Sequence, residues 1–346
     1  MPGKAINVLM TGAGAPGGPG IIKCLLSDPS INLLVADADP GAIGKYLHNQ
    51  FIQIPLADDP GYAERLLEIC SEQRIDVLLP LVTKELFPLS IHKQAFEQQG
   101  TKVLVSSAEA IRISNDKSAC YRFLHAKGFE LPGFHIARTT EEFIHAAYEL
   151  GHPQRSFCFK PSLSNGSRGF RVVSDSINES DELFKNKPFT VFITYAHALK
   201  ILSSQAFPEL LVTEYLPAEE YSIDCLAQNG EAKLIVPRLR TKMINGISVQ
   251  GEFVNDEDII DYCTRLISLV GLHGNIGIQV KRSASGQPLL VEVNPRVQGT
   301  IIAALGAGVN LPLLAIKQEL GLAIDPSELN VKWGTKFSRF WTEIFY

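Results

Sequence analysis

Polar side chains gather at the end of an apolar segment near residue 290. Leu289–Val293 is apolar except for Glu292, which predicts a buried strand. Glu292 and Asn294 should share one face of this strand, because side chains alternate between its faces. Pro295 then ends the strand pairing, so that Arg296 can turn into an open site. Carboxylate and amide oxygens suit Mg²⁺, and a guanidinium suits the charge of a phosphate, so these residues predict a site for a metal-bound polyphosphate. A capped edge strand with a surface ion pair is the alternative explanation.

A second strand is predicted beside the first. Gly277–Lys281 is short and largely apolar, and Ser283–Pro288 has the small residues, glycine and proline of a hairpin connection. Gln279 can therefore lie across from Glu292.

A loop of small residues separates two further predicted strands. Phe157–Pro161 and Phe170–Val173 have the apolar character of strands, and Ser162–Gly169 connects them. Backbone N–H groups of such a loop can fold over phosphates, and Lys160 and Arg168 add positive charge beside them.

Acidic residues follow another predicted strand. Leu210–Pro217 leads into a stretch that contains Glu219, Glu220 and Asp224. Carboxylates at such a strand end can accept hydrogen bonds from the amine and hydroxyl groups of a nucleoside. For Asp224, an ordinary strand end is an equally good explanation.

Taken in order, these motifs resemble the ATP-grasp superfamily. The strongest resemblance is to the ATP-binding halves of carbamoyl-phosphate synthetase large subunits, and biotin carboxylase is a more distant relative. The motifs run from about Asp116 to Arg296 in the order and with intervals typical of the family. Over the rest of the chain the resemblance is looser.

The resemblance implies a role for each of these residues. Lys117 and Lys160 would hold the phosphates of ATP, and the loop would be a mobile lid that contacts them through Gly166, Ser167, Arg168 and Gly169. Glu214, Tyr215 and Leu216 would bind adenine, and Glu220 would bind ribose. Gln279, Glu292 and Asn294 would hold Mg²⁺ or Mn²⁺, and Arg296 would lie beside a reacting acyl phosphate. The residues expected to act directly in catalysis are Lys160, Glu292 and Arg296.

Two arginines on a further predicted strand are candidate anion ligands. Arg238 and Arg240 share one face of that strand, where they can bind phosphate or an anionic substrate, or face solvent. Arg238 is assigned to the nucleotide site.

The composition fits an enzyme of this kind. The chain has 346 residues, of which 45% are hydrophobic, and at roughly 100–200 residues per domain it should form two or three domains. The net charge of −5 offers no basic surface for nucleic acid. Six scattered cysteines without CxxC spacing argue against a zinc site or disulfide framework, and indicate a reducing compartment. Without a signal peptide or an apolar run of about 18 residues, a cytoplasmic, membrane-free protein is expected.

Strands and helices alternate in the first hundred residues, which predicts a parallel sheet. Its first turn carries G-x-G-x-x-G at Gly12, Gly14 and Gly17, and Asp37 lies about 20 residues further on. This dinucleotide fingerprint supports a rival prediction, an NAD(P)-dependent Rossmann oxidoreductase. Pro16 and Pro19 disturb the helix start that should bind a pyrophosphate.

The predicted fold class is α/β, with α+β character toward the C-terminus. Residues 1–107 should form a Rossmann-like domain, 108–208 a small lid subdomain, and 209–346 an antiparallel-sheet subdomain with the metal site. Within 174–208, only a helix from Tyr195 to Ser203 is indicated. Ile301–Leu305 and Leu311–Leu320 should be helices packed under the metal strand. The aromatic tail Trp333–Tyr346 should pack in the core rather than form a contact in a homodimer.

The predicted function is an ATP-dependent, ADP-forming ligase, most simply one that forms a carbon–nitrogen bond. ATP would phosphorylate a small-molecule carboxylate, and an amine or another nucleophile would displace phosphate from the acyl phosphate. The family also offers phosphorylation of bicarbonate or carbamate, for which this chain matches about one of two synthetase halves. A catalytically silent nucleotide-binding regulator is the third alternative.

Overall fold

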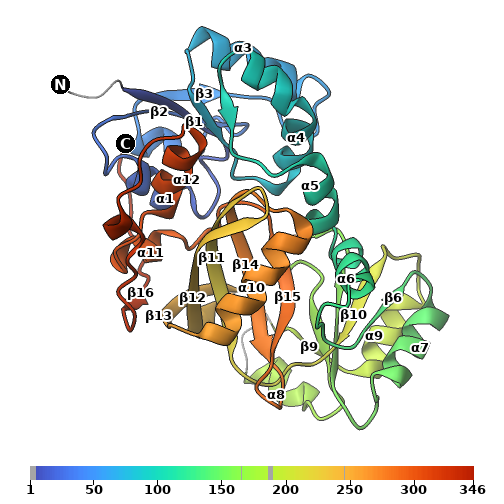
Figure 1. The fold of residues 1–346 in the computed structure, drawn as a ribbon. Helices are drawn as coiled ribbons and strands as arrows, with labels where there is room; N and C mark the ends of the chain where they lie inside the picture. Colours follow the sequence, from blue (N-terminus) through green and yellow to red (C-terminus); the bar gives the residue numbers. More distant parts are fainter. Residues whose placement is uncertain (1–4, 165, 186–189, 245) are drawn as a thin grey trace.

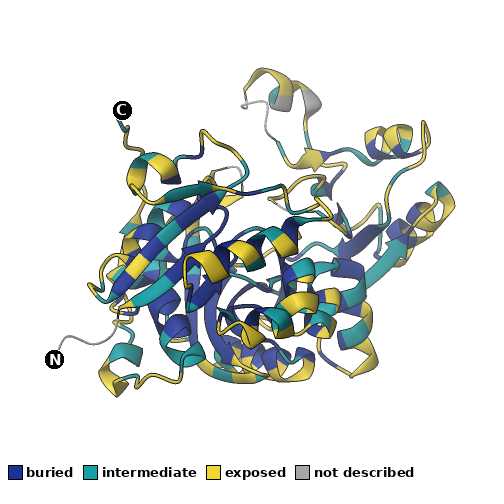
Figure 2. Ribbon diagram, turned by 90° about the horizontal axis from the view of Figure 1, so that it is seen from above, coloured by how far each residue is buried: buried dark blue, intermediate teal, exposed yellow. Residues whose placement is uncertain are grey.

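The computed structural model describes residues 5–164, 166–185, 190–244 and 246–346, and in these parts of the chain the strands form three sheets (Figure 1). Buried residues concentrate on the strands, and exposed residues follow the outer sides of the helices (Figure 2). The hydrophobic core is divided among clusters that lie on the faces of these sheets.

The first sheet is parallel, as predicted, with the order β3-β2-β1-β4-β5. Apolar residues of its central strands, such as Val8, Leu33 and Val77, are buried between helices on the two faces. Its strands are β1 (Ile6–Met10), β2 (Ile31–Asp37), β3 (Phe51–Gln53), β4 (Val77–Leu79) and β5 (Lys102–Val103), and its helices are α1 (Gly18–Leu25), α2 (Gly44–Leu47), α3 (Tyr62–Glu72) and α4 (Thr83–Gln98).

Two short helices follow the first sheet. Helix α5 (Ala108–Asn115) begins where the Ser107 hydroxyl accepts a hydrogen bond from the backbone N–H of Ala110. Helix α6 (Lys117–Ala126) is capped in the same way by Asp116. Such caps satisfy N–H groups that have no partner within the helix, and they fix Lys117 at the first helical position.

The second sheet, in the order β6-β10-β7-β8-β9, belongs to the small subdomain. Strand β10 pairs antiparallel with β6 and β7, because Leu210 and Val212 pack into this subdomain's core. The predicted boundary at residue 209 therefore places β10 with the wrong sheet. The elements here are β6 (Phe134–Ala137), α7 (Thr140–Glu149), β7 (Phe157–Pro161), β8 (Arg171–Val173), α8 (Glu179–Phe184), β9 (Phe192–Ile193), α9 (Tyr195–Leu202) and β10 (Leu210–Glu214).

The third sheet, in the order β15-β14-β11-β12-β13-β16, is antiparallel, as predicted. Helix α10 (Glu257–Val270) covers one face with a stripe of buried residues and ends at Gly271, whose φ of +73° suits glycine. The opposite face carries the polar residues of the site. The strands are β11 (Glu220–Gln228), β12 (Glu231–Ile244), β13 (Ile247–Phe253), β14 (Gly274–Arg282), β15 (Pro288–Asn294) and β16 (Lys336–Ser338).

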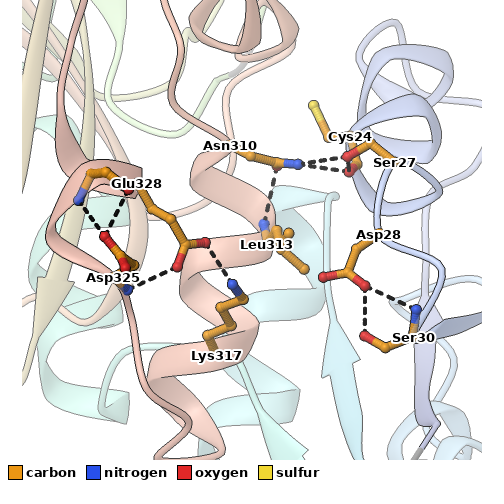
Figure 3. A network of polar contacts seen from close by, with 10 residues as sticks. Cys24, Ser27, Asp28, Ser30, Asn310, Leu313, Lys317, Asp325 and Glu328 are labelled. Carbon is orange, nitrogen blue, oxygen red and sulfur yellow. Dashed lines mark hydrogen bonds and ion pairs between the residues drawn. The ribbon is translucent and has the colours of Figure 1, made fainter. Parts of the chain in front are cut away.

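Two helices after β15 join the C-terminal part to the first domain. Helices α11 (Ile302–Gly306) and α12 (Leu311–Glu319) share one apolar cluster with α1. Asn310 donates to the carbonyl of Cys24 at 2.8 Å, and a short 3-10 turn, Pro326–Leu329, supports α12 from its other side (Figure 3). The expectation that both helices lie under β15 is wrong, since α12 packs between α1 and strands β11 and β14, and α11 packs against α1.

The aromatic tail corrects another expectation. Phe337, on the edge strand β16, packs against the core, but Phe340, Trp341 and Phe345 are 85%, 87% and 93% exposed. The ring of Tyr346 stacks on Tyr46 of the first domain. Among the described residues, no helix has the length and apolar character needed to span a membrane.

Candidate active site

A cavity of about 770 Å³ lies between the second and third sheets. This volume is in the range of small-molecule sites, about 300–1,000 Å³. Its wall contains most of the residues predicted for the site, namely Lys117, Lys160, Gly166, Ser167, Arg168, Gly169, Glu214, Tyr215, Leu216, Glu220, Gln279 and Glu292. The predicted residues Asn294, Arg296 and Arg238, all within the described chain, do not line this cavity.

The proposed metal ligands lie together on one face of the third sheet. Gln279 pairs in register with Glu292, and the Asn294 amide donates to Glu292 Oε1 at 2.8 Å. Among the described residues, no three His, Cys, Asp or Glu side chains form a metal-binding group. One carboxylate with two amides fits Mg²⁺, which commonly takes one or two protein carboxylates and completes its coordination with phosphates and water.

Two lysines bring positive charge to this carboxylate. The Lys117 ammonium lies 3.7 Å from Glu292 Oε2 and donates to the carbonyl of Ser164 at 2.5 Å. Lys160 donates to the carbonyl of Val291 at 2.6 Å. Burial lowers the pKa of Lys160, and the Lys117 charge lowers it further, although Glu292 opposes both effects. The lysines can therefore exchange protein oxygens for the oxygens of a bound anion.

The loop after β7 has the backbone conformation of a tight cradle. Gly166, Ser167 and Gly169 all have positive φ, at +63°, +59° and +77°. The loop lies against Gly246, in the turn between β12 and β13. The approach is so close that a Cβ atom on Gly246 would lie 2.4 Å from the Ser167 hydroxyl. The predicted loop also includes Asn165, which lies outside the described residues.

The other end of the cavity carries groups that suit a nucleoside. Glu214 Oε1 accepts a hydrogen bond from the N–H of Gly133 at 3.0 Å. Lys281 lies over the ring of Tyr215, 5.2 Å from its centroid. Glu220 forms an ion pair with Arg240, so a ribose there would share this carboxylate with the guanidinium.

Arg240, rather than Arg238, lines the cavity. Arg238 is fully buried and donates to Asp224 at 3.3 Å and to Thr300 at 2.7 Å. The assignment of Arg238 to the nucleotide site is therefore wrong, because the chain after Pro295 returns across it. Since Tyr221 pairs with Leu239, the strand register places Arg240, the other candidate of the sequence analysis, beside Glu220.

The same contact corrects the interpretation of Asp224 as an ordinary strand end. Asp224 lies within β11 and is fully buried against Arg238. Burial raises the pKa of its carboxyl group, and the guanidinium only partly offsets this effect.

Arg296 turns toward the first domain. Its Nε donates to the Thr83 hydroxyl at 3.0 Å, and another donor reaches the carbonyl of Val297 at 2.8 Å. Burial lowers the pKa of the Arg296 guanidinium, while the charges of Glu292 and Glu85 raise it. Arg296 therefore lies between the metal strand and the start of α4.

Glu85 was missed by the sequence interpretation. Its buried carboxyl accepts a hydrogen bond from the Thr11 hydroxyl, and burial raises its pKa to about 8. Nothing local to Glu85 in the sequence indicates burial, because its partner follows a strand more than seventy residues earlier.

The glycine-rich turn is filled by the protein itself. Gly14 donates to Asp37 Oδ2 at 2.7 Å, which uses the carboxylate that a ribose would need. Gly17 packs against Gly299, and a Cβ at Gly17 would lie 2.6 Å from the Gly299 Cα. These glycines thus permit close packing between domains, and this role opposes the dinucleotide interpretation.

Comparison with known proteins agrees with this geometry. Residues 206–338 match the family model "ATP-grasp in the biosynthetic pathway with Ter operon", and residues 20–104 match "PylC-like, N-terminal domain". The match to the ATP-grasp model covers strands β10 to β15, which carry the predicted metal ligands and the nucleoside end of the cavity.

Within this class, the chain is similar to the carbamoyl phosphate synthase large chain, as the sequence motifs indicated. Identity is 27% to the protein of Rubrobacter xylanophilus over 76% of this chain and 24% of the relative. Identity to the Thermus thermophilus protein is 20% over 81% of this chain and 27% of the relative. The chain spans about a quarter of the length of these relatives.

Solved structures of ATP-grasp ligases share the fold at 15% sequence identity. The ADP complex of N5-carboxyaminoimidazole ribonucleotide synthetase superposes with a TM-score of 0.69, over 95% of this chain and 80% of that one. Biotin carboxylase from Campylobacter jejuni gives 0.68 over 95% and 74%. The L-amino acid ligase from Bacillus licheniformis gives 0.66 over 95% and 78%. The predicted α/β ATP-grasp architecture is confirmed.

Proposed function

We propose that this protein is an ADP-forming ligase that joins a small-molecule carboxylate to an amine or another nucleophile. One observation carries the proposal: a single cavity collects two lysines, a lid-like loop, the carboxylates of Glu214 and Glu220, and the Glu292 carboxylate. Relatives whose names describe synthetases, carboxylases and ligases support it.

The chemistry would proceed in two transfers. A carboxylate oxygen attacks the γ-phosphorus of ATP, and the bond between the γ-phosphorus and the bridging β-phosphate oxygen breaks. ADP departs, and the carboxylate has become an acyl phosphate. The nucleophile's lone pair then attacks the acyl carbon, phosphate departs with the bonding electrons, and the amine loses a proton. Bicarbonate or carbamate phosphorylation is the variant of the first transfer that the carbamoyl phosphate synthase relatives suggest.

The protein would act mainly through charge. Lys117 and Lys160 would face the phosphate oxygens, and Arg296, which lies outside the cavity wall, would meet charge that develops during transfer. Glu292, Gln279 and Asn294 would hold Mg²⁺, which supplies further neutralisation of the phosphates when bound. No nucleophilic side chain is required, in keeping with six buried cysteines.

Thermal melting with Mg²⁺-ATP, Mg²⁺-NAD and no ligand tests nucleotide binding first. At 100 times its dissociation constant, Mg²⁺-ATP should stabilise the protein by about 2.7 kcal/mol, whereas NAD should give no shift. A shift with NAD alone would overturn the proposal. A screen for ADP release with pooled carboxylates and amines then identifies the substrates, and sedimentation with and without them tests whether the protein forms a homodimer.

A further inference from the structure

The phosphate-binding lysine and the lid-like loop share a buried polar support. Ser162, the first residue after β7, donates its N–H to the carbonyl of Glu209 at 2.9 Å. Its own carbonyl accepts the N–H of Lys117 at 3.0 Å. Two residues further on, the Ser164 carbonyl accepts the Lys117 ammonium at 2.5 Å. Ser162 thus holds the backbone of Lys117, and Ser164, two residues along the same segment, holds its ammonium group.

Glu209 holds Ser162 through its side chain as well. The Ser162 hydroxyl donates to Glu209 Oε1 at 3.0 Å and lies 2.5 Å from the Ser118 hydroxyl, on the first turn of α6. Both serines are buried. Arg138 fixes the other carboxylate oxygen at 2.5 Å. Glu209 therefore connects α6, the end of β7 and the start of β10 at one point.

These contacts favour the ionised form of the Glu209 carboxyl group. Burial by itself would raise the pKa of the carboxyl group, but the hydroxyls of Ser162 and Ser118 and the charge of Arg138 lower it overall. An ionised carboxylate accepts stronger hydrogen bonds than a neutral group. Glu209 does not line the cavity, so it acts on the site through its neighbours.

We infer that Glu209 is a positioning residue, which orients Lys117 and the base of the loop toward the phosphates of the nucleotide. The inference rests on the proposed function, since it assumes that Lys117 binds ATP. Its consequence is energetic coupling: the contribution of Glu209 to nucleotide affinity should depend on Lys117.

A double-mutant cycle measures this coupling. Calorimetry gives the dissociation constant of a nonhydrolysable ATP analogue with Mg²⁺ for the parent, Glu209→Ala, Lys117→Met and the double variant. In the parent background, Glu209→Ala should weaken binding about tenfold, which is about 1.4 kcal/mol. In the Lys117→Met background the same change should weaken it less than about twofold.

Three further proteins sharpen the test. Ser162→Ala should reproduce the coupling without removing a charge, and it serves if Glu209→Ala does not fold. Glu209→Gln, which can still accept from Ser162, should recover most of the affinity. Glu149→Gln, on the exposed side of α7 in the same subdomain, is the matched control and should bind like the parent.

The possible results distinguish a failure of this inference from a failure of the proposed function. Equal losses in both backgrounds would show that Glu209 only supports the fold, and no loss in either would show that it is irrelevant; both overturn the inference. A parent protein that does not bind the analogue overturns the proposed function itself.

Discussion

Replacing Glu292 with glutamine perturbs the centre of the proposed site while keeping its shape. The change removes the negative charge that lies 3.7 Å from the Lys117 ammonium. At an effective dielectric constant of about 20, the Coulomb attraction over that distance is about 4.5 kcal/mol. The Glu292 side chain is 21% exposed and Lys117 keeps its bond to Ser164, so solvent and this contact offset much of the loss. We expect the free energy of unfolding to fall by about 1–2 kcal/mol.

The effect on chemistry should be far larger than the effect on stability. Removing groups that merely support metal ligands commonly costs about 10–100-fold in metal affinity or activity, so loss of a ligand carboxylate should cost more than about 100-fold in turnover. Nucleotide affinity in Glu292→Gln should also no longer rise with added Mg²⁺.

The assay is ADP formation, or metal-dependent binding of an ATP analogue until a substrate is known, with melting temperature measured in parallel. If Glu292 were only an ion-pair partner, its loss would affect stability alone. A Glu292→Gln protein with parental turnover and metal dependence would refute the assignment of β15 as the metal strand.

Three further contrasts follow from the site. Lys160→Ala should weaken binding of the ATP analogue at least about tenfold, whereas Arg296→Ala should spare binding and lower turnover, because Arg296 meets charge that develops during transfer; equal affinity losses would contradict this division. Arg238→Met should cost about 3–5 kcal/mol of stability by leaving a buried carboxylate unpaired, while Arg240→Gln should mainly weaken nucleotide binding. Denaturant unfolding measures the first effect and calorimetry the second, and an unstable Arg240→Gln beside a weakly binding but stable Arg238→Met would contradict both. Because burial raises the pKa of Glu85 from 4.5 to about 8, the folded protein keeps a proton that the unfolded chain releases, and stability is lost as pH rises between these values. Glu85→Gln removes this titration. The melting temperature of the variant minus that of the parent should therefore increase from about pH 5 to about pH 8, and a difference that stays constant would contradict the titration of Glu85.

Sequence patterns identified most of the cavity because its residues lie on short local motifs. Strand alternation is enough to place Glu292 and Asn294 on one face, and a hairpin connection is enough to bring Gln279 opposite Glu292. Helix capping by Asp116 likewise fixes the start of α6 and so the position of Lys117. These features depend on neighbours within a few residues, which the sequence displays directly.

Two of the errors at the site trace to one segment, residues 296–300, whose path no local pattern specifies. After the metal strand, Arg296 bonds to Thr83, more than two hundred residues earlier. Gln298 then lies over Gly277, where a Cβ would be 2.1 Å from the glutamine side chain, and donates to the carbonyl of Ile223 at 2.9 Å.

The next two residues of this segment explain why the glycine-rich turn is closed and why Arg238 is buried. Gly299 fills the glycine-rich turn at Gly17, which closes the place that a dinucleotide would need. Thr300 accepts a hydrogen bond from the Arg238 guanidinium and helps to bury it, so Arg240 is the arginine that lines the cavity. The segment thus packs against the first domain and the third sheet together, and such long-range packing decides which of two equivalent residues on a strand face can reach a ligand. For this chain, a variant that alters the path of 296–300 should therefore change the first domain's contact and the choice between the two arginines at the same time.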